Sequence, residues 1–116
     1  MKNICDIKSP LLVESQVNII YSKLSEAPEL YATDGLEIRE VVVKLFCSSM
    51  VLYVVEYDSK ERIAFGYMQN DADPTLSEWG YSSIDELIES GFEMDLFLSD
   101  TVIDKSGIVS EIENVY

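Results

Sequence analysis

The sequence predicts an α+β fold, in which a four- or five-stranded antiparallel sheet, arranged as a meander, carries helices on one face. Three observations indicate this fold. An amphipathic stretch precedes residue 28, β-branched and aromatic runs follow between residues 41 and 98, and the connections between those runs are short. With 116 residues, 47% of them apolar, the chain is long enough for one domain with its own core, and we expect residues 1–116 to form it.

The first helix is expected over residues 10–25. Ser9 suits its N-cap, and Pro10 suits its first position. Apolar residues then recur at helical spacing, namely Val13, Val17, Ile20 and Leu24. The helix should end before Pro28, because the residue before a proline disfavours helical dihedral angles.

Residues 28–35, "PELYATDG", then connect the helix to the sheet. Thr33, Asp34 and Gly35 supply turn chemistry, and Leu30 and Tyr31 are expected to anchor the connector on the sheet.

Three closely spaced runs, at residues 41–47, 50–57 and 62–69, predict an antiparallel meander. The second run is apolar on both faces, which indicates a central strand. Gly66 marks a bulge or the close approach of another element.

The second half of the chain continues with shorter elements. Residues 70–75 read as a polar loop and 78–82 as a short strand. Ser83 and Glu86 match a capping box for a helix that ends at Gly91. Residues 92–98 alternate apolar and acidic side chains, as an edge strand does, so the sheet should span about residues 41–98.

A C-terminal helix is expected over about residues 106–115. Its apolar stripe would consist of Ile108, Val109, Ile112, Val115 and Tyr116.

Charge is the most unusual property of the sequence. The net charge is −14, and residues 68–116 contain 12 acidic residues and one basic residue. Direct binding of that half to nucleic-acid phosphates is disfavoured because such binding depends on Lys and Arg. Anionic membranes are disfavoured for the same reason. A basic partner, or simple solubility, explains the charge.

The residue types present argue against several other classes of protein. The chain has no histidine and no Cys-x-x-Cys pair, so we expect no zinc site and no cofactor. Residues 70–78 contain acids but lack the spacing of an EF-hand loop. Without histidine, acid–base catalysis would depend mainly on pairs of carboxylates, which need a substrate cleft that so small a domain hardly offers. We therefore expect no enzymatic activity. Without a signal-peptide pattern or a long apolar run, a cytoplasmic protein is expected.

The acidic residues of the second half form the candidate partner-binding face. They lie on a loop, a helix and a strand that we expect to be neighbours, and they are Asp71, Asp73, Glu78, Asp85, Glu86, Glu89, Glu93 and Asp95. Such a set could imitate the charge of a short stretch of duplex DNA, which carries about one charge per 1.7 Å. The alternative is a solvated face that keeps the protein soluble.

Aromatic residues on the predicted strands have a similar pair of interpretations. They are Tyr53, Tyr57, Phe65, Tyr67, Trp79 and Tyr81. Cross-strand packing explains them, whereas a stacking platform for single-stranded nucleic acid would need adjacent basic residues.

Several segments in order resemble a bacterial family. They are "LYATDG" (30–35), "VVVKLF" (41–46), "VLYVVEYDSKERIAFGY" (51–67), "EWGYSSIDEL" (78–87) and "EMDLFL" (93–98). Over residues 24–100 the chain resembles an uncharacterised family of short acidic proteins from plasmids, conjugative elements and phages, although Asp34 stands where Glu is usual. The resemblance implies a mobile-element context and no established enzymatic activity. Some relatives in that family are implicated as antagonists of CRISPR nucleases.

Charge and resemblance together predict a non-enzymatic inhibitor, of the anti-CRISPR or anti-restriction kind. It would mimic nucleic-acid charge against a basic nucleic-acid-binding protein, such as a CRISPR effector. The first alternative is a structural or housekeeping protein–protein interaction module without such mimicry. The second is a small enzyme that uses carboxylates.

Overall fold

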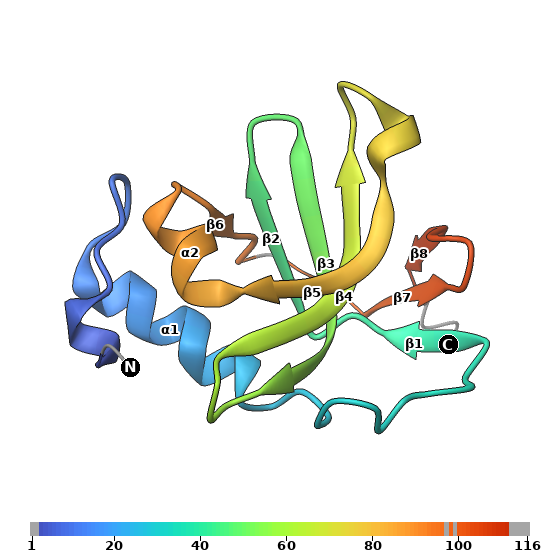
Figure 1. Ribbon diagram of the computed structural model, residues 1–116, viewed down its shortest axis with the longest axis horizontal. Coiled ribbons are helices and arrows are strands. Elements are labelled where there is room, and N and C mark those ends of the chain that lie inside the picture. Colours follow the sequence, from blue (N-terminus) through green and yellow to red (C-terminus); the bar gives the residue numbers. More distant parts are fainter. Residues whose placement is uncertain (1–2, 97, 99, 112–116) are drawn as a thin grey trace, which may run out of the picture.

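Two antiparallel sheets and two α-helices make up the fold (Figure 1). The structure, a computed structural model, describes residues 3–96, 98 and 100–111. The larger sheet contains β5 (Glu78–Ser83), β4 (Ile63–Asn70), β3 (Met50–Asp58), β2 (Val43–Cys47) and β6 (Glu93–Met94), in that order. The smaller sheet contains β1 (Ile38–Glu40), β7 (Thr101–Asp104) and β8 (Val109–Glu111). The helices are α1 (Glu14–Leu24) and α2 (Ile84–Glu89), and the short 3-10 turns are η1 (Ile4–Asp6) and η2 (Pro74–Leu76). The predicted α+β fold with an antiparallel sheet is confirmed.

Both helices pack on one face of the larger sheet. Leu52 and Val54 of β3 point to that face and form one core with Ile20 of α1 and with Ile84 and Ile88 of α2, all at most 1% exposed. The alternating side-chain directions of a strand place the residues between them on the other face.

The smaller sheet covers that other face. Tyr53 and Val55 of β3 pack there against Val41 and against Ile103 of β7. β3 is therefore covered on both sides, which explains why its sequence is apolar on both faces. The sequence did not predict the smaller sheet, because β1 and β8 are only three residues long and largely exposed.

A β-bulge in β3 sets the direction of a charged side chain. Val54 pairs with Gly66 and Glu56 pairs with Phe65, so Val55 is the extra residue. The side chain of Glu56 thereby lies on the same face of the sheet as that of Phe65. Glu56 is buried there and is only 2% exposed.

Gly66 is required by the close approach of β3. A Cβ atom on Gly66 would lie 2.2 Å from the carbonyl oxygen of Tyr53, which is backbone and cannot move aside. We expect Gly66→Ala to lower the free energy of unfolding by about 2 kcal/mol, in the range of other overpacking substitutions. Its cross-strand partner Gly80 is the matched control, because a Cβ there meets no atom within 4 Å. Urea unfolding that showed equal costs for Gly66→Ala and Gly80→Ala would contradict this explanation.

The first helix begins four residues later than predicted. The Ser9 hydroxyl oxygen accepts hydrogen bonds from the N–H groups of Leu11 and Leu12, so it caps a turn that precedes α1. Val13 is the N-cap residue and is 63% exposed, while Tyr21 joins the buried stripe of the helix.

Two predictions for the end of the chain need correction. The expected helix at 106–115 is wrong for residues 106–111, which form a turn and β8; residues 112–116 lie outside the described residues. The carboxylate of Asp104 accepts from the N–H groups of Ser106 and Ile108, and Gly107 adopts a φ of +86°, which together turn the chain into a hairpin. Of the edge strand expected at 92–98, the described residues contain only β6, which pairs with β2; residue 97 lies outside the described residues.

The helix after β5 follows the prediction more closely. The Ser83 side chain accepts from the N–H of Glu86 at 3.4 Å, and Gly91, with a φ of +102°, follows the end of α2.

Candidate partner-binding surfaces

The eight predicted acidic residues fall into three groups in the structure. Asp71, Asp73 and Glu78 lie on the β4–β5 connection and the start of β5, and all three are exposed. Figure 1 shows η2 at one end of β5 and α2 at the other end. The remaining residues are Asp85, Glu86 and Glu89 on α2, and Glu93 and Asp95 at β6. Because β5 and β6 are opposite edges of the larger sheet, the groups do not all lie side by side as expected.

Asp85 belongs to a buried network rather than to the surface. Its carboxylate accepts from Nη2 of Arg62 at 2.7 Å, from Nε at 2.8 Å, and from the hydroxyl of Tyr21 at 2.5 Å. Arg62 is 7% exposed, although it adopts a φ of +56°. Burial raises the pKa of Tyr21, and the hydrogen bond to Asp85 raises it further, so the phenol stays protonated. We therefore remove Asp85 from the set of residues that could face a partner.

Within the described part of the chain, four basic residues form ion pairs with acids of the same chain. The pairs are Lys23–Glu26 (3.6 Å), Lys44–Asp95 (3.6 Å), Arg62–Asp85 (2.7 Å) and Lys105–Glu37 (3.1 Å). Nζ of Lys44 also lies 5.7 Å from the ring centroid of Tyr53, so this half-buried lysine contacts both a carboxylate and an aromatic ring. Asp71, Asp73, Glu78 and Glu86 remain exposed on a protein whose net charge is −14.

The connector at 28–35 is fastened to the larger sheet by Glu56. The carboxylate of Glu56 accepts from the N–H of Tyr31 at 2.8 Å, from the N–H of Thr33 at 2.9 Å, and from the hydroxyl of Thr33. Burial alone would raise the pKa of Glu56. The hydrogen bonds from Thr33 and Tyr31 and the charge of Arg39 outweigh burial, and they hold that pKa below its ordinary value. No sequence motif signals this interaction, since its partners are more than 20 residues apart.

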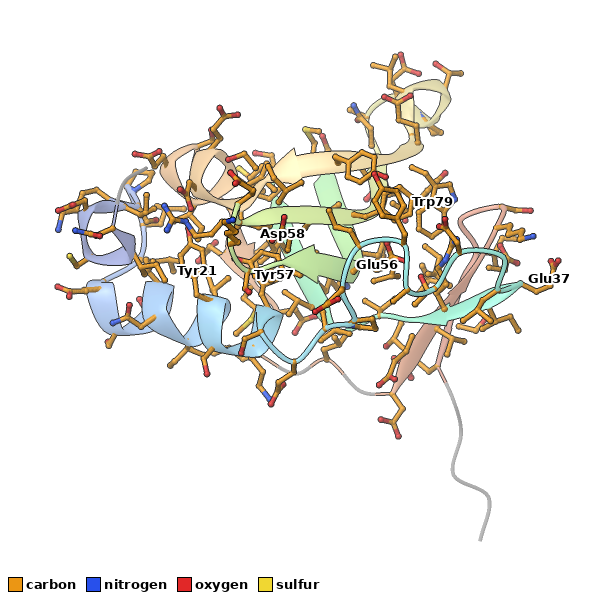
Figure 2. All side chains as sticks on the ribbon, turned by 60° about the horizontal axis from the view of Figure 1, so that its bottom comes forward. Tyr21, Glu37, Glu56, Tyr57, Asp58 and Trp79 are labelled. Carbon is orange, nitrogen blue, oxygen red and sulfur yellow. The ribbon has the colours of Figure 1, made fainter. Side chains whose placement is uncertain are left out.

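An aromatic cluster, of which Figure 2 labels Trp79, contacts Tyr31 of this connector. Phe65 stacks on Trp79 with centroids 5.5 Å apart, and Tyr81 contacts both Phe65 (5.0 Å) and Tyr31 (6.4 Å). The guanidinium of Arg39 lies 5.1 Å from the Trp79 ring and donates to the carbonyl of Thr33. Cross-strand packing accounts for Phe65 and Trp79, whereas Tyr31 and Tyr81 are 64% and 53% exposed.

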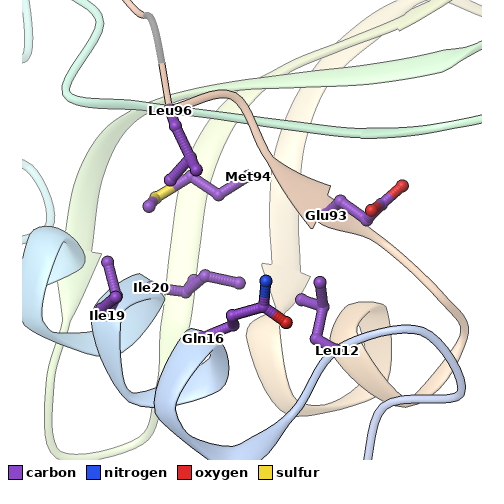
Figure 3. Close-up of a pocket in the computed structure, with 7 residues that line it drawn as sticks. All are labelled: Leu12, Gln16, Ile19, Ile20, Glu93, Met94 and Leu96. Atoms are coloured by element: carbon purple, nitrogen blue, oxygen red, sulfur yellow. The ribbon is translucent and has the colours of Figure 1, made fainter.

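A small apolar pocket lies between α1 and β6 (Figure 3). It has a volume of about 120 Å³, and its lining includes Ile19, Ile20, Met94 and Leu96. Leu96 is 68% exposed and Ile19 is 47% exposed, so apolar surface reaches the solvent here.

Among the described residues, no three His, Cys, Asp or Glu side chains are grouped so that they could hold a metal ion. The carboxylate of Asp73, in the loop with some resemblance to a calcium site, accepts from the N–H and the hydroxyl of Thr75. No helix in the described part of the chain has the length and apolar character needed to cross a membrane.

The fold and these surfaces define an α+β protein that combines a four-stranded meander, β2 to β5, extended at its β2 edge by β6, with a second, three-stranded sheet. Comparisons with protein-family models, with curated proteins and with solved structures return no match.

Proposed function

We propose that this protein is a non-enzymatic binding protein that occupies a basic, nucleic-acid-binding surface of another protein. The observation that carries the proposal is the distribution of charge. Four cationic side chains among the described residues are paired internally, and carboxylates of the second half are exposed at both ends of β5. Such a surface steers the protein toward a positively charged channel and competes there with nucleic acid.

The resemblance to short acidic proteins of mobile elements supports a particular class of partner. CRISPR nucleases and restriction enzymes hold nucleic acid in basic channels, so an inhibitor of either would use this charge. These are the host proteins to test first.

Charge reversal on the exposed carboxylates is expected to weaken partner binding by at least about tenfold at low salt. Each of these carboxylates contributes chiefly through long-range attraction to the basic partner, which salt screens. The variant is Asp71→Lys/Glu78→Lys/Glu86→Lys, which leaves the Arg62–Asp85 pair untouched. The partner is captured from the host, identified, and titrated at 50 and 200 mM NaCl with and without competing duplex DNA.

The matched control is Glu14→Lys/Glu40→Lys/Glu111→Lys, which changes three exposed carboxylates on other elements and gives the same net charge. We expect it to keep most of the affinity. Equal loss in both triple variants, or a partner that binds DNA and this protein simultaneously, would refute the proposal.

A second candidate function rests on the apolar pocket between α1 and β6. Exposed Ile19 and Leu96 favour a protein–protein contact in which charge plays little part. Such a module would form a complex or dimer whose mass, measured by light scattering, is the same at 50 and 500 mM NaCl.

A further inference from the structure

An open depression lies where the 28–35 connector meets the end of β3. It has a volume of about 410 Å³ and is lined by Glu29, Leu30, Tyr31, Tyr57, Asp58 and Ser59. The connector therefore supplies one wall, and β3 with the turn after it supplies the other. Figure 2 shows Tyr57 and Asp58 together on β3, far from Glu37.

Both charged side chains of the lining are acidic. Glu29 is exposed and Asp58 is half-buried, and neither forms an ion pair within the part of the chain that the structure describes. One oxygen of Asp58 accepts from the backbone N–H of Lys60 at 2.9 Å, which fixes the carboxylate at the wall. The lining of the depression is thus acidic, and Arg62, whose charge also acts on Tyr57, is already paired with Asp85.

Tyr57 adds a polar group that lacks a partner. The residue is only 5% exposed, yet its hydroxyl makes no hydrogen bond within residues 3–96, 98 and 100–111. No fully buried side-chain oxygen is left without a hydrogen bond there, so this hydroxyl retains contact with solvent. Burial raises the pKa of Tyr57 to about 12, and the neutral phenol can both donate and accept.

Tyr31 lines the depression and also contacts Tyr81, with ring centroids 6.4 Å apart. Its φ of +71° is unfavourable for a residue other than glycine. The hydrogen bonds from Tyr31 and Thr33 to the buried Glu56 maintain that backbone, and 64% of Tyr31 stays exposed. Tyr31 therefore offers exposed aromatic surface from a fixed backbone position.

We propose that this depression binds an arginine side chain presented by a basic protein partner. The aliphatic part of the arginine lies against Leu30 and the Tyr31 ring, and its guanidinium lies between Glu29 and Asp58. A planar guanidinium fits better than an ammonium, because it can stack on the ring while its five N–H groups reach both carboxylates and the Tyr57 hydroxyl. The inference rests on the proposed function. It adds one specific contact, with an arginine side chain, to the general attraction between an acidic protein and a basic partner.

The test uses the whole chain and two synthetic probes, nona-arginine and nona-lysine peptides, at 150 mM NaCl. Glu29→Gln/Asp58→Asn removes both charges with little change in shape, and the amide oxygen introduced at position 58 can still accept from the N–H of Lys60. The matched control is Glu14→Gln/Glu111→Gln, which removes two exposed charges elsewhere that likewise form no ion pair within the described part of the chain. Binding is measured by calorimetry and located by amide chemical shifts in two-dimensional NMR.

We expect the Glu29/Asp58 variant to bind nona-arginine about fivefold more weakly than the control variant. Shifts should concentrate at residues 29–31 and 57–59, and nona-lysine should bind more weakly than nona-arginine. Equal affinities of the two variants, or shifts spread over the acidic groups of β5 and α2, would overturn the arginine site. That result would leave the proposed function standing, because the charge-reversal experiment tests it with different residues.

Discussion

Asp85→Ala is expected to lower the free energy of unfolding by about 3–5 kcal/mol, the usual cost of removing one partner of a buried ion pair. The substitution leaves the guanidinium of Arg62 buried without its carboxylate and removes the acceptor of the Tyr21 hydroxyl. For a domain of this size the melting temperature should fall by roughly 10–20 °C. Thermal unfolding followed by circular dichroism measures this shift.

Two further variants separate the ion pair from other causes. Tyr21→Phe removes only one hydrogen bond and should cost about 1 kcal/mol. Glu86→Ala, one position further along α2 and exposed, should cost less than about 1 kcal/mol. A similar small effect for Asp85→Ala and Glu86→Ala would show that Asp85 is a surface acid after all.

Glu56→Ala is expected to cost about 3 kcal/mol, because it leaves the N–H groups of Tyr31 and Thr33 without the charged acceptor that they share. The connector at 28–35 should then lose its fixed backbone. Faster amide hydrogen exchange at residues 31 and 33 would report this directly. Unchanged exchange at both amides would contradict the role given to Glu56.

The same carboxylate should make stability depend on pH. The pKa of Glu56 is lower in the folded protein than the value of about 4.3 expected for an unfolded chain. Its contribution is therefore complete above about pH 4.3 and is lost as the pH falls through the folded-state pKa. The difference in melting temperature between the natural protein and Glu56→Gln should shrink from pH 6 to pH 3. A constant difference over that range would contradict the assignment.

Local sequence patterns predicted the meander because its strands follow one another directly along the chain. The apolar runs at β2, β3 and β4 are separated by tight turns, and Ser83 caps the helix that follows β5. The end of the chain misled the prediction, since Ile108 and Val109 fit a helical stripe as well as a strand. The turn formed by Asp104 and Gly107 decides in favour of the strand.

The candidate site depended on contacts that local patterns do not encode. The sequence did not distinguish Asp85 from the other seven acids of the candidate face. Its partner Arg62 is 23 residues away, and the two residues meet only in the folded chain. Glu56 lies within an apolar strand, and its role becomes visible only when the bulge after Val54 turns it toward Thr33.

The pairing of β1 with β7 has a consequence for the order of folding. Ile38 pairs with Asp104, so the smaller sheet joins the two chain segments that flank the whole meander. Closing so long a loop costs more chain entropy than forming the β2–β3 hairpin, and contacts of that separation form slowly. We expect the meander to assemble first and the smaller sheet to dock last. Trp79, the single tryptophan, donates its indole N–H to the carbonyl of Lys105 at 3.0 Å, so its fluorescence should follow that final step.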